Sequence, residues 1–180
     1  MEKIPQPNSN FNDGSQSEIV QLLAQVAVLS VLTDGERAQL AKKARMVAYG
    51  TGEFIVRQGE PGKSLFIVHT GVCEVFVLDP QGHGKKVAQT KRGGFFGEMS
   101  LLTGEPHTAT VRAMEDTTLV AINKVIFASI LEANPAISEE LGKVLAMRQK
   151  KLAELTGSPG DEKHSSSNMI ARIKSFFRIE

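Results

Sequence analysis

The stretch from Gly93 to Thr110 constrains the fold more than any other part of the sequence. It reads GGFFGEMSLL over residues 93–102 and PHTAT over residues 106–110. This pattern predicts a turn, one short helical turn, a short loop and then a strand. Such a path directs several backbone N–H groups at one point, and that arrangement attracts an anion. Glu98 places a carboxylate at the same point, so an anion that also carries hydroxyls, such as a sugar phosphate, would suit both groups.

The surrounding sequence has the pattern of short β-strands. Several segments are short, rich in apolar residues and bounded by turn residues. They are 54–56, 65–70, 72–78, 85–90, 108–113 and 117–122. Glycine-rich turn clusters separate them at 58–62 and 80–84. Many short strands joined in this way and flanked by helices predict a mainly β protein with an antiparallel roll or barrel.

Helices are expected before these strands. Ser17 can cap a helix whose apolar residues follow helical spacing from Ile19 to Leu29. The sequence Thr33-Asp34-Gly35-Glu36 is a capping-box pattern, which predicts the start of a second helix.

Helices are also expected after the strands. Residues 125–132 read as a short helix, and Asn134 can cap the next one with Pro135 at its first position. That long helix is expected to end near Leu155. Its apolar seam contains Leu141, Leu145, Arg148, Leu152 and Leu155. The seam has coiled-coil spacing, so it suggests self-association into a homo-oligomer.

Composition narrows the class of protein. The chain has 180 residues, 41% of them hydrophobic, which is enough for one domain with tails. A formal net charge of +1 gives no general attraction to nucleic acid. The single cysteine, Cys73, fits a reducing compartment, so a cytoplasmic location is expected. Neither a nucleophile–base pair nor a metal-ligand spacing stands out, so we expect no enzyme and no metal or cofactor.

The stretch over residues 93–110 resembles the phosphate-binding cassette of cyclic nucleotide-binding domains, and we call it the cassette. That family's cassette reads Phe-Gly-Glu-x-(Ala/Ser)-Leu, then Pro-Arg-(Ala/Ser/Thr)-Ala-Thr. The turns at 50–53, 58–60 and 71 also match the family in the correct order. The resemblance covers residues 19–155. It implies an eight-stranded jelly roll with N-terminal helices, an inserted cassette helix and two C-terminal helices.

The resemblance also implies a site for cAMP or cGMP. The expected ligand-binding residues are Val87, Phe96, Gly97, Glu98, Met99, Ser100, Leu101, His107, Thr108, Ala109 and Arg148. Glu98 would accept a hydrogen bond from the ribose 2′-hydroxyl. The N–H groups of Gly97, Ser100 and Leu101 would meet the cyclic phosphate.

The remaining roles follow from the same resemblance. Val87 and Phe96 would form apolar walls, and a hydroxyl at the position of Thr108 favours cGMP in some relatives. Arg148 has two interpretations. It either closes over the base with the long helix or extends from a helix interface to solvent.

His107 is the one departure from the cassette pattern, because the family has a phosphate-pairing arginine there. A neutral imidazole donates at most one hydrogen bond, whereas arginine offers a charged fork. Two hypotheses therefore stay open: a regulatory domain that binds a cyclic nucleotide, and an interaction or assembly domain whose pocket has lost its nucleotide. A catabolite-activator type of transcription factor is not expected, because residues 156–180 are too few and too rich in Ser and Gly for a DNA-binding helix-turn-helix domain.

The cassette and the ending at residues 171–177 also resemble bacterial small mechanosensitive channels with a C-terminal cyclic-nucleotide domain. That resemblance implies a sensor on the cytoplasmic side of a channel. The expected organisation is a flexible segment over 1–15, the binding domain over 16–155, a flexible linker over 156–168 and a basic amphipathic tail over 169–180. The tail is a disordered end, a membrane-surface helix or a docking helix.

Overall fold

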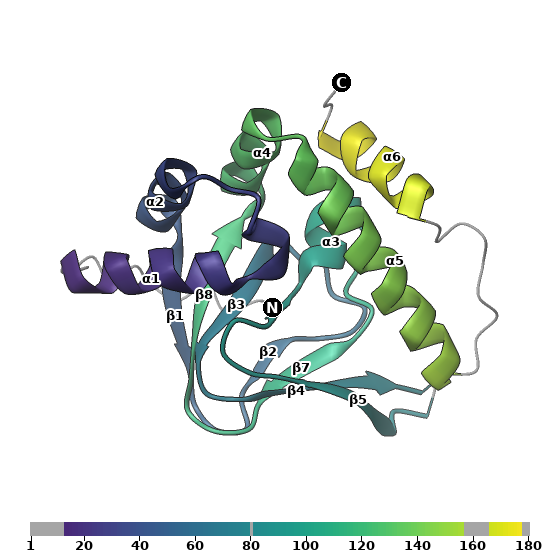
Figure 1. The fold of residues 1–180 in the computed structure, drawn as a ribbon. Coiled ribbons are helices and arrows are strands. Elements are labelled where there is room, and N and C mark those ends of the chain that lie inside the picture. The colour runs from purple at the N-terminus through teal and green to yellow at the C-terminus, as the bar shows by residue number, and fades with distance from the viewer. Residues whose placement is uncertain (1–12, 80, 157–165, 178–180) are drawn as a thin grey trace.

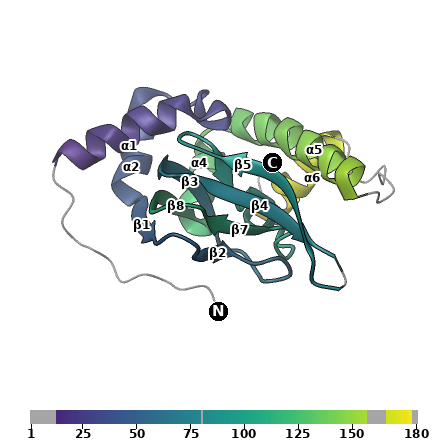
Figure 2. The same cartoon turned by 90° about the horizontal axis from the view of Figure 1, so that it is seen from below.

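The computed structural model describes residues 13–79, 81–156 and 166–177. Its centre consists of two four-stranded antiparallel sheets (Figures 1 and 2). The first sheet has the order β1-β8-β3-β6, formed by Arg45–Tyr49, Thr117–Asn123, Ser64–Thr70 and Phe95–Phe96. The second has the order β2-β7-β4-β5, formed by Phe54–Val56, Thr110–Ala113, Cys73–Leu78 and Gly84–Thr90. This arrangement confirms the expected jelly roll.

Helices cover one side of the roll (Figure 1). They are α1 (Asp13–Gln25), the 3-10 turn η1 (Ala27–Leu29), α2 (Asp34–Lys43), α3 (Glu98–Thr103), α4 (Lys124–Ala133), α5 (Ala136–Thr156) and α6 (Ser166–Phe177). Strand β3 shows why the core has two parts. Leu65 and Ile67 pack with the helices, whereas Phe66 and Val68 pack between the sheets. Because successive strand side chains point to opposite faces, the apolar run Leu65–Val68 of one strand serves both clusters.

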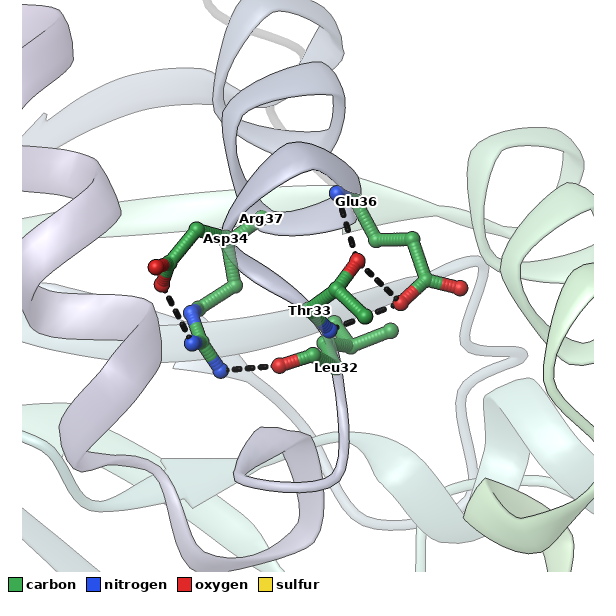
Figure 3. Close-up of polar contacts among 5 residues, drawn as sticks. All are labelled: Leu32, Thr33, Asp34, Glu36 and Arg37. Carbon is green, nitrogen blue, oxygen red and sulfur yellow. Dashed lines mark hydrogen bonds and ion pairs between the residues drawn. The ribbon is translucent and has the colours of Figure 1, made fainter.

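The capping box at the start of α2 is confirmed. The Thr33 hydroxyl accepts a hydrogen bond from the Glu36 N–H at 3.3 Å, and the Thr33 N–H donates to the Glu36 carboxylate at 2.7 Å (Figure 3). Arg37 adds a hydrogen bond to the Leu32 carbonyl and an ion pair of 2.6 Å with Asp34. The two contacts between Thr33 and Glu36 satisfy N–H groups that would otherwise lack partners at a helix start.

Two expected caps are wrong. Ser17 lies inside α1, which spans Asp13–Gln25, so residues 13–15 are helical rather than part of a flexible segment. The burial of Ile19, Leu22 and Leu23 fixes this helix, and a cap at Ser17 is not needed. The amide of Asn134 donates to the Val31 carbonyl at 3.3 Å instead of capping α5. Residues 1–12 of the expected flexible segment lie outside the described residues.

The end of the chain differs from the expected linker and tail. Helix α5 extends to Thr156, and α6 begins at Ser166, which was expected to belong to the linker. Residues 157–165 and 178–180 lie outside the described residues. Of the three alternatives for the tail, the structure has the docking helix, because Met169, Ile173 and Phe177 are buried against this same domain. Among the described residues, none of the helices combines the length and apolar character needed to cross a membrane.

The seam on α5 is used within the chain. Leu141 and Leu145 are fully buried in the helical cluster, and Leu152 lines the cavity described below. The side chain of Leu155 lies outside the described ones. The observation that suggested self-association is therefore accounted for by contacts inside one chain.

Candidate functional site

The cassette is held by its backbone. Gly97 has φ +84° and precedes α3, and a Cβ atom at this position would lie 2.6 Å from the Ser64 carbonyl oxygen of β3. Only glycine fits both the left-handed conformation and the close approach. Gly104 ends the helix with φ +73°, and its N–H donates to the Ser100 carbonyl at 3.0 Å. The short helix is therefore fixed at both ends by glycines.

The cassette and the second half of α5 enclose a cavity of about 290 Å³. Most of the sequence-predicted residues line it: Val87, Phe96, Gly97, Glu98, Met99, His107, Thr108, Ala109 and Arg148. Ser100 and Leu101 are buried in α3 and are outside the lining. The Leu101 N–H donates to the Gly97 carbonyl at 3.2 Å, so the expectation that it meets a ligand is wrong.

The sequence analysis missed part of the lining. Val56, Val75 and Val111 point inward from three strands, and Phe95, Gln149 and Lys151 add an aromatic and two polar groups. Strand alternation was a usable signal for the valines. Nothing local marks Gln149 and Lys151, because the direction of their side chains depends on how α5 crosses the sheets.

Glu98 and Arg148 form the polar centre of the cavity. The Arg148 Nη1 atom donates to Glu98 Oε1 at 2.7 Å and to the Phe95 carbonyl at 2.9 Å. Its guanidinium carbon lies 4.2 Å from the centre of the Phe95 ring, within range of a cation–π contact. The Glu98 side chain is 5% exposed and that of Arg148 is 41% exposed. Arg148 therefore contacts the cassette instead of only extending from a helix interface to solvent, and its expected closure over a base stays a prediction.

His107 occupies the position of the family's arginine and is buried. Its Nδ1 atom lies 3.0 Å from the Ser100 hydroxyl, and Gly62 packs against the ring so closely that a Cβ there would be 2.4 Å from Cε1. Burial lowers the pKa of His107, and the charge of Glu60 opposes this effect. The imidazole is therefore mostly neutral near pH 7, and the cassette carries no permanent positive charge at this position.

The described residues also include possible metal ligands. Among the described residues, the acidic, histidine and cysteine side chains do not form a group of three or more that could hold a metal ion. The lone thiol, Cys73, is buried on β4, and burial raises its pKa to about 11.

Comparison with known proteins agrees with this geometry. Residues 46–134 match the family model of the cyclic nucleotide-binding domain. The chain carries a domain of this family. The chain is 32% identical over 127 residues to a cAMP-dependent protein kinase regulatory subunit of Dictyostelium discoideum, covering 71% of this chain and 39% of that protein. The corresponding subunit of Blastocladiella emersonii is 33% identical over 109 residues, covering 61% and 27%.

Solved structures give the same family relation. The regulatory subunit of a cAMP-independent protein kinase A from Trypanosoma cruzi, bound to guanosine, has a TM-score of 0.62 at 30% identity, covering 69% of this chain and 43% of that one. The regulatory domain of Toxoplasma gondii PKA with cAMP has a TM-score of 0.66 at 26% identity, covering 72% and 49%. This chain therefore spans less than half the length of these relatives. The relatives named here are kinase regulatory subunits, and they do not show the expected relation to mechanosensitive channels.

Proposed function

We propose that the cavity binds a cyclic nucleotide and that α5 transmits its occupation to other parts of the protein or its partners. The observation that carries this proposal is the buried carboxylate of Glu98 in a mostly apolar cavity, held by an arginine from another element. A carboxylate in that position can accept a hydrogen bond from a ribose hydroxyl. The apolar walls, which include Val56, Val87 and Val111, suit the face of a purine.

Arg148 supplies the positive charge that His107 lacks. A guanidinium has five N–H donors, and both hydrogen bonds of Arg148 to described residues use Nη1. The remaining donors can hold a phosphate oxygen while the Glu98 contact is kept. Arginine suits this task because its planar fork matches carboxylate and phosphate oxygens. Lys151 also lines the cavity and adds a second cation.

A second candidate ligand is an uncharged nucleoside. Burial keeps His107 mostly neutral, so the cassette offers less to a phosphate than an arginine would. The Trypanosoma cruzi relative, a subunit of a cAMP-independent kinase, was solved with guanosine. A ribose held by Glu98 and a base between apolar walls would need no phosphate partner.

Titration calorimetry with cAMP, cGMP, adenosine and guanosine tests these proposals. We expect His107→Arg to strengthen cyclic-nucleotide binding by about ten- to a hundredfold, the value of one charged hydrogen bond, and to leave nucleosides unchanged. Lys85→Arg, on the exposed part of β5, is the matched control. Binding of nucleosides alone would support the second candidate. Binding of none of the four would favour an interaction or assembly domain with a lost pocket.

The pH dependence separates the two ligand classes further. An anionic phosphate favours the protonated imidazole, so the affinity for cAMP should increase as the pH falls below about 6.5. The increase should span the range between the pKa of His107 in the complex, which the phosphate raises, and the pKa in the free protein, which burial lowers. Nucleosides carry no phosphate and should show no such increase. His107→Arg should remove the dependence, because arginine stays charged.

A channel output is a further part of the proposal. It rests on the resemblance of the cassette and of residues 171–177 to cyclic-nucleotide-regulated mechanosensitive channels. In that arrangement the domain would lie on the cytoplasmic side of the membrane. The test is whether the intact protein in membrane vesicles conducts ions in a cyclic-nucleotide-dependent way. Conductance that is unchanged by saturating nucleotide would contradict a channel output.

A further inference from the structure

Helix α6 packs on both walls of the cavity without lining it. It contacts α3, which begins at Glu98, and α5, which carries Arg148. Figure 1 shows α6 beside α5 and close to α4. Among the described residues that line the cavity, none belongs to α6. A movement of α5 relative to α3 must therefore either carry α6 along or break one of its two interfaces.

The contacts of α6 are those of a packed core element. Met169, Ile173 and Phe177 are buried at helical spacing, in the same cluster as Leu141 and Leu145 of α5. The Phe177 ring lies 6.4 Å from that of Phe127 on α4, measured between centroids. Such an interface has few alternative packings, because close-packed side chains do not deform continuously.

A polar contact joins α6 to the cassette itself. The Arg172 Nη2 atom lies 2.5 Å from Glu105 Oε1. Glu105 stands between the end of α3 and His107, so this ion pair holds the loop that carries the cassette histidine. Both side chains are partly exposed, which makes the pair accessible to substitution without opening the core.

We propose that α6 is an intramolecular clamp that joins the cassette helix to α5, so that docking of α6 and occupation of the cavity favour each other. The proposal deepens the function proposed above and rests on it for the ligand. In the described state α5 covers the cavity, Arg148 holds Glu98, and α6 is docked. Docked α6 therefore stabilises the arrangement in which α5 covers the cavity. By linkage, a ligand that binds only to this arrangement stabilises the docked position of α6.

The test uses the full chain with two kinds of variant. Ile173→Ala removes a fully buried side chain of α6, and Ser175→Ala on the exposed face of the same helix is the control. Arg172→Glu breaks the ion pair at the surface, and the double variant Arg172→Glu with Glu105→Arg restores it. The surface variants keep the test valid if Ile173→Ala does not fold.

We expect Ile173→Ala and Arg172→Glu to speed amide exchange in α3 and over residues 148–152, and to weaken cAMP binding by about tenfold. The double variant with reversed charges should restore most of the parent's slow exchange and most of its affinity for cAMP. In the parent chain, saturating ligand should slow exchange in α6. Changes confined to α6 would overturn the clamp. If the parent binds none of the four ligands, the proposed function fails, and the exchange in α3 and α5 without ligand still decides whether α6 holds them together.

Discussion

The cassette wall of the cavity is held by glycines, backbone bonds and buried polar groups, whereas the facing wall on α5 is more exposed to solvent. Gly97, Glu98 and His107 belong to the packed interior. The α5 wall, residues 148–152, has no fully buried member and meets the cassette through Arg148. The first wall is preorganised and the second is adjustable. Under the proposed function we therefore expect the cassette to select the ligand and α5 to carry the conformational response.

The largest test of this contrast is Gly97→Ala. The left-handed backbone costs a residue with a side chain about 1–2 kcal/mol, and a Cβ 2.6 Å from the Ser64 carbonyl adds to this. We expect the free energy of unfolding to fall by about 3 kcal/mol. Gly52→Ala is the control, because Gly52 has φ +83° and open space around it, and about 1 kcal/mol is expected there. If urea unfolding gives equal losses of the free energy of unfolding for Gly97→Ala and Gly52→Ala, the cassette is not tightly packed.

The next effect concerns the single ion pair between the walls. Arg148→Gln leaves the buried Glu98 carboxylate without its cation, and we expect a loss of about 1–2 kcal/mol, reduced because Arg148 is partly exposed. The control is Arg112→Gln, which removes a similarly exposed arginine from Glu74 on the second sheet. This variant should lower the free energy of unfolding by less than about 1 kcal/mol. Amide exchange should rise over residues 148–152 only in the first variant. A rise in the cassette instead would reverse the assignment of rigid and adjustable walls.

A smaller loss is expected inside the cassette. Ser100→Ala removes the hydroxyl that lies 3.0 Å from His107 Nδ1 and leaves a buried ring nitrogen without that partner. In thermal unfolding, the free energy of unfolding should fall by about 1 kcal/mol. Ser129→Ala, at an exposed position of α4, is the control and should change stability by less than about 0.5 kcal/mol. No difference between the two variants would mean that the Ser100–His107 contact does not stabilise the cassette.

The smallest effect is the pH dependence of stability. The pKa of His107 lies below its ordinary value of 6.5 in the folded protein, mainly because the ring is buried. The unfolded chain therefore binds more protons in this window, and the free energy of unfolding should fall as the pH drops below 6.5. His107→Gln should remove that part of the slope, and comparison of the two proteins cancels the other titrating groups. Identical slopes between pH 7 and 5.5 would contradict the burial of a neutral imidazole.

Much of the fold was predictable because its signals are local. The capping box at Thr33 and the turn at Gly97 depend on residues within one or two helical turns. The strands followed from alternation and turn residues, and the cassette pattern placed seven of the residues that line the cavity. The start of α1 was not predictable in this way, because burial of its apolar residues against the rest of the domain outweighs a local cap.

By itself the sequence determined a jelly roll with a glycine-fixed cassette, a carboxylate at its turn and a histidine in place of an arginine. Only the tertiary structure decided which groups meet. It brought Arg148 onto Glu98 across 50 positions of the chain, paired His107 with Ser100, and seated α6 on the domain instead of leaving it as a tail. The Ser100–His107 contact spans only seven positions, whereas the contacts of Arg148 and of α6 join side chains far apart in sequence. The geometry of these distant contacts depends on how α5 and α6 cross the sheets. No periodicity or short motif encodes such a crossing, because it is set by the packing of the whole core.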